Sequence, residues 1–238
     1  IEKFSNKISC TFHVNNLGMM PNFINTLKSC NGEYIAICEG DDYWIDPLKL
    51  QKQVDFLESN KDYVICFHKV MILNDNNLEA DINIERRYNS IKKLPATVLD
   101  LLEHGNFIHT PSVLFRNQIT DLPTEFVYST VGDYFLYIIH SQKGYIKRLD
   151  EVMAIYRNNV GIYSTLSVTE MTKKMVIYNS CILSYLTSPD QREILLKRQI
   201  SIINSMDISQ SNTDLGIKNL INRLSIKDIL NLFVQKIK

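Results

Sequence analysis

Residues 32–47 read Gly-Glu-Tyr-Ile-Ala-Ile-Cys-Glu-Gly-Asp-Asp-Tyr-Trp-Ile-Asp-Pro, so an apolar run leads directly into a cluster of acids. The run at 34–38 has the composition of a buried strand. The acids at 39–42 flank Gly40, which we expect to let the backbone turn sharply. Ligands of open α/β sheets bind beyond the carboxyl ends of strands. The stretch therefore predicts a ligand site at the edge of an α/β sheet.

The cluster itself consists of Glu39, Asp41 and Asp42. Like charges this close repel one another unless a cation lies between them. Oxygen ligands suit Mg²⁺ or Mn²⁺, which bind proteins through one or two carboxylates together with substrate phosphates. The cluster therefore predicts a metal-bridged diphosphate site with Mn²⁺ or Mg²⁺ as the cofactor. The alternative is an acidic turn that caps a helix.

Composition bounds the class of protein. The chain has 238 residues and 45% of them are hydrophobic, which allows one large domain, or one domain with an appendage, to bury a sizeable core. Lys+Arg and Asp+Glu are both 26. This balance lacks the basic footprint of a nucleic-acid-binding protein, so we expect no nucleic-acid partner.

Cysteine usage and the ends of the chain bear on location. The 5 cysteines show no CxxC spacing, which favours a reducing compartment over a disulfide framework. No secretory signal opens the chain, and no apolar run reaches the roughly 18 residues that a membrane span needs. We therefore predict a cytoplasmic protein. The chain opens on Ile1 rather than Met, and we expect an N-terminal segment to be absent from it.

Apolar periodicity and turn residues outline the secondary structure. The expected strands cover 8–14, 34–38, 63–67 and 112–115, with a strand, a turn and a strand over 145–157; the expected helices cover 21–29, 97–103 and 131–140. The first strand, helix and second strand read as a β-α-β unit, which implies a parallel, right-handed crossover.

Two further segments carry specific expectations. Asp46 is expected to cap a helix with Pro47 at its first position, because both residue types favour helix starts. The buried side of that helix is predicted to present Leu50, Val54 and Leu57. Residues 78–95 are polar and charged and are expected to form a long loop, either a lid or an insertion.

The C-terminal part differs in texture, since helical periodicity dominates from about residue 168. We predict a domain over 1–164 and a helical region over 165–238. Ser225 and Asp228 suggest a capping box for a final helix with one apolar and one basic side. That helix either packs on its own domain or makes a peripheral contact with an anionic membrane surface.

Several short motifs follow one another in a characteristic order. They are Asn16-Leu17-Gly18, Pro21-Asn22-Phe23, Gly32-Glu33-Tyr34-Ile35-Ala36, Glu39-Gly40-Asp41-Asp42-Tyr43-Trp44, His109-Thr110-Pro111-Ser112-Val113, Val131-Gly132-Asp133-Tyr134 and Glu151-Val152-Met153-Ala154-Ile155-Tyr156-Arg157. Together they resemble the family 2 glycosyltransferases with the GT-A fold, over residues 8–164.

The resemblance implies an α/β fold, a GT-A-like (Rossmann-like) mixed sheet flanked by helices, with a C-terminal helical extension. It implies an inverting, metal-dependent transfer of a hexosyl or N-acetylhexosaminyl group from a nucleotide-sugar, with a UDP-sugar favoured, to a glycan or lipid-linked acceptor. The expected setting is cell-surface polysaccharide synthesis at the inner face of the membrane. The family's first two βα units are not found in this chain, which predicts an N-terminal truncation of about 60 residues at roughly 30 residues per unit.

The resemblance also assigns roles near the acidic turn. Glu39-Gly40-Asp41 resembles the family's Asp-X-Asp element, in which Asp41 is similar to the acid that binds the metal. Glu39 stands where an acid contacts the ribose or the metal shell, and Asp42 is expected to support them from behind. Asn16 and Gly18 are assigned with these residues to donor binding.

Two residues from later motifs complete the expected site. Asp133 resembles the catalytic base that takes the proton of the acceptor hydroxyl; the alternative is a first-turn Asp that only stabilises its helix dipole. Arg157 follows an apolar strand and is the candidate to hold a diphosphate oxygen. His109 either faces the acceptor or is structural, and Trp44 either stacks on a sugar or belongs to the core.

Two other functions compete with this reading. One alternative hypothesis is a catalytically inactive fragment or scaffold of the same fold that acts as an interaction module. The other is a different nucleotide-sugar enzyme, such as a nucleotidylyltransferase, although that class normally carries a Gly-rich phosphate loop near its start, which this sequence does not show.

Overall fold

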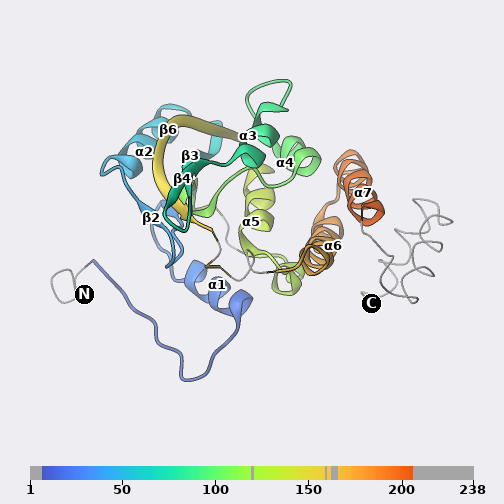
Figure 1. Cartoon of the computed structure of the whole chain (residues 1–238), viewed down its shortest axis with the longest axis horizontal. Helices are drawn as coiled ribbons and strands as arrows, with labels where there is room; N and C mark the ends of the chain where they lie inside the picture. Colours follow the sequence, from blue (N-terminus) through green and yellow to red (C-terminus); the bar gives the residue numbers. More distant parts are fainter. Residues whose placement is uncertain (1–6, 119–120, 159, 162–165, 206–238) are drawn as a thin grey trace.

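The structure, a computed structural model, describes residues 7–118, 121–158, 160–161 and 166–205. These residues form a mixed sheet flanked by helices (Figure 1). The strands are β1 (Tyr34–Ala36), β2 (Tyr43–Trp44), β3 (Tyr63–Asn74), β4 (Asn77–Ala80), β5 (Leu114–Arg116) and β6 (Tyr145–Arg157). The helices are α1 (Met19–Lys28), α2 (Lys49–Ser59), α3 (Ile82–Asn89), α4 (Val98–His104), α5 (Gly132–Ser141), α6 (Val168–Tyr185) and α7 (Pro189–Asn204), with short 3₁₀ turns η2 (Thr110–Ser112) and η3 (Thr124–Tyr128).

The sheet has the order β1-β5-β3-β6-β2, and β4 pairs with the far end of β3. β3 and β6 are parallel, whereas β1 with β5, β3 with β5, β2 with β6 and β3 with β4 are antiparallel. The predicted fold class, an α/β mixed sheet flanked by helices with a helical C-terminal extension, is therefore confirmed.

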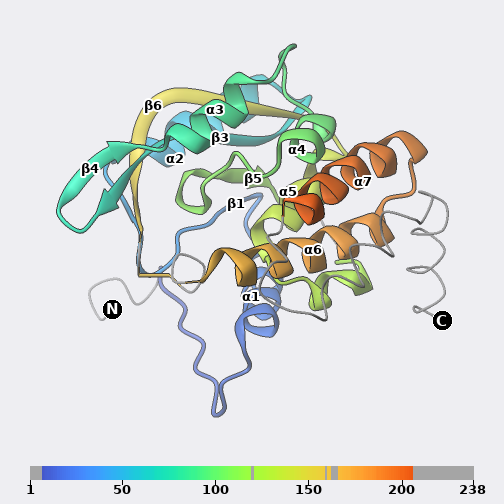
Figure 2. The same ribbon diagram turned by 45° about the vertical axis from the view of Figure 1, so that its right-hand side comes forward.

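The main core lies between the sheet and the helices α4 to α7. In α5 every residue from Tyr134 to Ser141 is buried, so this helix occupies the middle of the core. Figure 2 shows α6 and α7 beside each other along α5 and α4. Both C-terminal helices place apolar side chains in the same core as the sheet: Ile182, Leu183, Leu195 and Leu196. The domain boundary at residue 164 remains a prediction, and the final helix with its membrane-facing side lies outside the described residues.

The expected first strand is wrong. Residues 8–14 form no strand and run as an extended arm away from the body of the molecule (Figures 1 and 2). Phe12 is 88% exposed and Val14 is fully exposed. A strand requires a hydrogen-bonded neighbour, and β1 pairs with β5 alone in the described part of the chain. The β-α-β unit and its parallel crossover fail with that strand, since β1 is antiparallel to its partner.

The helix after the acidic turn begins later and buries a different side than expected. α2 starts at Lys49, and Asp46 accepts the Leu48 backbone N–H at 2.7 Å without capping the helix. The buried residues are Lys49, Gln53 and Leu57, while Leu50 is 39% exposed. Polar side chains can face the core here because they are hydrogen-bonded.

Gln53 is the centre of this buried polar contact. Its Nε2 donates to the carbonyl oxygens of Cys66 at 2.8 Å and Ser112 at 2.9 Å, and its Oε1 accepts from Lys49 Nζ at 2.8 Å. The amide thus joins α2 to β3 and to η2. Hydrogen bonding outweighs apolar periodicity at this position, which explains why the buried face could not be read from the sequence.

Two other segments differ from expectation. Residues 78–95 are not a long loop: they include most of β4 and all of α3, whose N-terminus is capped by Asp81 through the backbone N–H groups of Asn83 and Ile84. Residues 145–157 form one long strand rather than two, because a register irregularity opposite His68 and Lys69 absorbs the expected turn without breaking the pairing with β3.

We expect Gln53→Ala to lower the free energy of unfolding by about 2–4 kcal/mol, because two buried carbonyls would lose their donor at about 1–3 kcal/mol each. Urea denaturation measures the change. The matched control is Gln51→Ala on the exposed side of the same helix, where the amide bonds only Asp55. Equal stability of the two variants would contradict a structural role for the Gln53 amide.

Candidate active site

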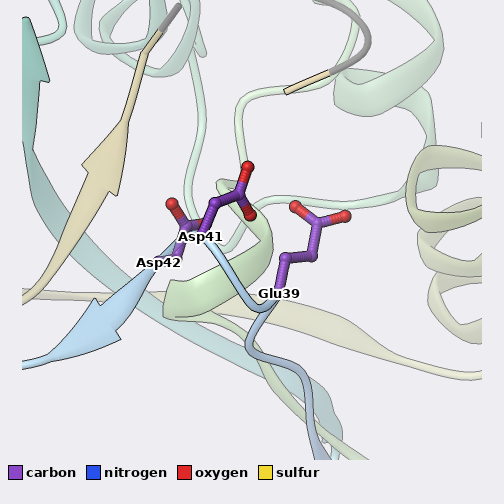
Figure 3. A group of neighbouring side chains, drawn as sticks. All are labelled: Glu39, Asp41 and Asp42. Carbon is purple, nitrogen blue, oxygen red and sulfur yellow. The ribbon is translucent and has the colours of Figure 1, made fainter. Parts of the chain in front are cut away.

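The acidic turn connects β1 to β2. The backbone N–H of Asp42 donates to the carbonyl oxygen of Glu39 at 3.1 Å, which closes the turn. Carboxylate oxygens of Glu39, Asp41 and Asp42 all lie within 4.8 Å of one another, and Figure 3 shows the three side chains leaving the turn toward the same side. Gly40 has no positive φ and open space where a Cβ would stand, so the expectation that the turn depends on this glycine is wrong.

Asp42 is held by the end of β6. Its Oδ1 accepts the backbone N–H of Arg157 at 2.9 Å. Its Oδ2 is buried and has no hydrogen-bond partner among the described residues. Burial is the largest cause that raises the pKa of this carboxyl to about 6, and the bond from Arg157 opposes it. A buried carboxylate oxygen without a donor is costly unless a cation meets it.

The pKa of the Glu39 carboxyl is raised further than that of Asp42. Burial of its carboxyl group raises its pKa to about 7, and the negative charges of Asp133, Asp42 and Asp41 add to the effect in that order. The hydroxyl of Thr110 acts in the opposite direction. The surface of the residue as a whole is exposed, but the carboxyl group faces a cavity wall that carries the other acids. The cluster is thus a concentration of negative charge to which no cationic side chain of the described residues is bonded.

Asp133 stands at the first turn of α5. The preceding Gly132 lies so close to α1 that a Cβ there would be 2.9 Å from the ring of Phe23, which fixes where the helix begins. Asp133 Oδ2 accepts from Asn106 Nδ2 at 3.1 Å. Desolvation raises the pKa of Asp133, while the Tyr134 backbone N–H and the Asn106 amide lower it. The residue as a whole is half-buried, and its desolvated carboxyl group is oriented by a side-chain donor.

One cavity of about 570 Å³ joins the acidic turn to Asp133, because Glu39, Asp41 and Asp133 all line it. Tyr156 also lines it, and burial together with the nearby acids raises the pKa of its phenol to about 12. The cavity thus combines two acids of the turn, Glu39 and Asp41, with the separate carboxyl of Asp133 at a helix start and the neutral phenol of Tyr156.

Three other predicted residues, Arg157, Asn16 and Gly18, do not line this cavity. Arg157 is exposed, and its guanidinium carbon lies 5.4 Å from the centre of the Tyr43 ring. Asn16 Oδ1 accepts the Gly18 N–H at 2.8 Å in the turn before α1, whose first residues Met19 and Met20 do reach the cavity. The donor-binding roles of Arg157, Asn16 and Gly18 stay predictions.

Trp44 and His109 have structural contacts. The Trp44 indole N–H donates to the Pro111 carbonyl at 2.9 Å, with Lys49 Nζ 4.4 Å from the ring centre. His109 Nε2 lies 3.1 Å from Asp81 Oδ2, and its ring stacks on Tyr156 at 4.9 Å between centroids. Both side chains connect the site to the elements around it. Trp44 is 37% exposed and in contact with Pro111 and Lys49, so it is neither a core residue nor a free stacking surface.

Sequence reasoning missed Asn106. It lies 27 positions before Asp133 and belongs to none of the motifs, so only the packing of α4 against α5 brings it to the site. Thr110 belongs to a motif of the sequence analysis but has no role assigned there. Its place between His109 and Pro111 in that motif is the feature of the sequence that pointed to it.

Comparison with known protein families assigns the chain to one of them. Residues 1–121 match the family described as Glycosyl transferase family 2. The chain belongs to glycosyl transferase family 2. The acidic turn and η2 lie within the matched residues, and the mixed α/β sheet is consistent with a GT-A-like fold. Asp133 and Arg157 lie beyond them.

Three relatives are similar to part of this chain. Uncharacterized proteins from Mycobacterium bovis and from two strains of Mycobacterium tuberculosis are each 36% identical to this chain over 146 residues. That alignment covers 60% of this chain and 40% of each relative, so the chain spans well under two thirds of their length. In the part of the chain that the structure describes, no helix is both long and apolar enough to span a bilayer.

The raised pKa values predict a pH dependence of stability. The folded chain binds protons at Glu39 and Asp42 more tightly than the unfolded chain, since their pKa values rise from 4.5 to about 7 and from 3.8 to about 6. Their contribution to stability is therefore complete at low pH and is lost as the pH rises through these values. Buried His68 and His140 have lowered pKa values and change stability in the opposite direction, so a variant must be compared with the wild type.

We expect metal-free Glu39→Gln to gain stability relative to the wild type as the pH rises from about 5 to about 7, because the substitution removes a carboxyl whose ionisation the fold opposes. Urea denaturation in a chelator at several pH values measures the difference. Glu33→Gln, an exposed acid before β1, is the control. A Glu39→Gln difference that stays constant with pH would contradict the electrostatic account.

Proposed function

We propose that this chain is the catalytic part of an inverting, metal-dependent glycosyltransferase. It would move a hexosyl or N-acetylhexosaminyl group from a nucleotide-sugar, with a UDP-sugar favoured, to a glycan or lipid-linked acceptor in cell-surface polysaccharide synthesis. The observation that carries the proposal is the single cavity that Glu39, Asp41 and Asp133 line in a member of glycosyl transferase family 2. A cytoplasmic location at the inner face of the membrane is part of the proposal.

The residues of the acidic turn fit a divalent cation. Three carboxylates offer oxygen atoms within 4.8 Å of one another, and Asp42 Oδ2 is a buried acceptor without a donor in the described chain. Hard oxygen ligands of this kind are those that Mg²⁺ and Mn²⁺ prefer. Asp41 and Glu39 would hold the ion, and Asp42, fixed by Arg157, would support them. A bound cation would offset the negative charge that develops on a leaving diphosphate.

Asp133 is suited to the role of general base. Its carboxyl faces the same cavity from a different element, so it stands apart from the acids that would hold the donor. The Asn106 amide fixes the orientation of the carboxyl, leaving the other oxygen to accept the acceptor's hydroxyl proton. A raised pKa makes a carboxylate a better base near neutral pH. The acceptor hydroxyl would then attack the anomeric carbon from the side opposite to the diphosphate.

Arg157 supports the donor side of the site. The backbone of Arg157 bonds Asp42, so its guanidinium starts from the edge of the acidic turn. A guanidinium at this place is able to bind diphosphate oxygens with two parallel N–H donors. Asn16 and Gly18 are proposed to contribute to donor binding through the turn that leads into α1.

We expect Asp41→Asn to abolish Mn²⁺-dependent binding of UDP, because the substitution removes a charged ligand from the cluster. Calorimetric titration with UDP, in the presence and absence of Mn²⁺, measures it. Asp55→Asn, an exposed acid on α2, is the matched control and should bind as the wild type does. Unchanged affinity in Asp41→Asn would remove the metal assignment, and no binding by the wild type would favour the inactive scaffold.

We expect Asp133→Asn to keep UDP affinity but to lower turnover at least about 100-fold, because general-base catalysis typically contributes about 10²–10⁴ in rate. UDP release from a UDP-sugar in the presence of an acceptor measures turnover. Asp190→Asn, which changes the first-turn acid of α7 at the surface, controls for the helix dipole. Lower stability with full turnover in Asp133→Asn would show that this residue serves its helix alone.

A further inference from the structure

Two arginines are among the residues that line the cavity. Arg87 from α3 and Arg198 from α7 line the same cavity as the acidic turn and Asp133. Among the described residues, neither guanidinium forms an ion pair with a carboxylate. Both side chains are half-buried. Half-buried charges are normally paired, so two adjacent unpaired arginines at a cavity wall require an explanation.

Arg198 is held in a fixed position. Its Nη1 donates to the Tyr134 hydroxyl at 3.0 Å, and the Tyr178 phenol is a second partner. Gly105, at φ +84°, leaves the space that the guanidinium fills, since a Cβ there would lie 2.5 Å from Arg198 Nη2. The neutral tyrosines orient the guanidinium without neutralising it.

Arg87 is held equally firmly, and it connects to the proposed base. Its Nη1 donates to the Asn106 carbonyl at 2.7 Å, and the Asn106 side chain in turn donates to Asp133 Oδ2 at 3.1 Å. α3 itself is anchored by the Arg148–Glu85 ion pair at 3.1 Å. One residue, Asn106, therefore positions both Arg87 and Asp133. The Arg87 guanidinium is thus separated from the proposed general base by this residue alone.

The two arginines repel each other. Burial and the positive charge of Arg198 both lower the pKa of Arg87, with burial the larger cause. The bond to Asn106 uses one of the five N–H donors of the Arg87 guanidinium. An anion between the two side chains would remove the repulsion and accept further donors, and phosphate and carboxylate match the planar guanidinium in geometry.

We propose that Arg87 and Arg198 form a subsite for an anionic group, a phosphate or a carboxylate, on the acceptor. This inference rests on the proposed function, which places the donor diphosphate at the acidic turn and the acceptor hydroxyl at Asp133. Asn106 links Arg87 to Asp133, so a group bound by the arginines belongs to the molecule whose hydroxyl Asp133 contacts. The acceptor is then a phosphate-bearing or acidic glycan rather than a neutral one.

The test uses the 238-residue chain in a chelator and three probes: glucose 1-phosphate, glucuronate and glucose. We expect at least one of the two anionic sugars to bind at least about tenfold more tightly than glucose in calorimetric titrations, because charge-assisted hydrogen bonds carry this much affinity. The tighter of the two identifies the group as phosphate or carboxylate. Equal affinity for all three sugars would overturn the proposal.

Variants locate the effect. Arg87→Gln should remove most of the preference for the anionic sugar, whereas Arg86→Gln, one position away on the exposed side of α3, should not change it. Arg198→Gln should act as Arg87→Gln does, and its unfolding transition is measured because it also loses its packing against Gly105. An unchanged preference in Arg87→Gln would overturn the subsite even if Arg198→Gln fails to fold.

One comparison separates this inference from the proposed function. Asp41→Asn should lose Mn²⁺-dependent UDP binding and keep the anion preference, because Asp41 lies in the turn between β1 and β2 whereas the arginines come from α3 and α7. Anion binding that depends on Arg87, in a wild-type chain that does not bind UDP with Mn²⁺, would support the subsite while the proposed donor site fails. Mn²⁺-dependent UDP binding without any preference for the anionic sugars would support the proposed donor site and overturn the subsite.

Discussion

Repulsion among three carboxylates is the constraint on which this molecule depends. Glu39, Asp41 and Asp42 share one short turn, and their oxygens lie within 4.8 Å of one another. Burial is the largest cause that raises the pKa values of Glu39 and Asp42, and the neighbouring negative charges add to it, so the cluster opposes its own ionisation. The surrounding fold must therefore hold the turn in place. The turn lies between β1 and β2, and the end of β6 donates a backbone N–H to the Asp42 carboxylate.

The segments that surround the acidic turn are hydrogen-bonded to η2. Trp44, directly after the acidic turn, donates to the Pro111 carbonyl, and Gln53 of α2 donates to the Ser112 carbonyl. Thr110 then faces Glu39, and His109 reaches Asp81 at the start of α3. A single buried turn thus fixes the acidic turn relative to both α2 and α3. Buried polar groups that are fully bonded in this way make one arrangement of the core more favourable than its alternatives.

Side chains of both charges line one cavity. Glu39 and Asp41 of the acidic turn line it together with Arg87 and Arg198, and Asn106 connects Asp133 to Arg87. A donor carrying a diphosphate and a metal, and an acceptor carrying an anion, would each meet side chains of suitable charge.

The sequence by itself determined the acidic turn, the helix start at Asp133 and the α/β class, because local composition and motif order specify them. It did not determine which side of α2 is buried, since Gln53 finds its acceptors only in β3 and η2. Nor did it place residues 8–14, whose apolar alternation predicts a strand although strand pairing is a tertiary contact. The meeting of Asn106 with Asp133, and of Arg87 with Arg198, was decided by helix packing alone, because residues far apart in sequence carry no local signal of their contact.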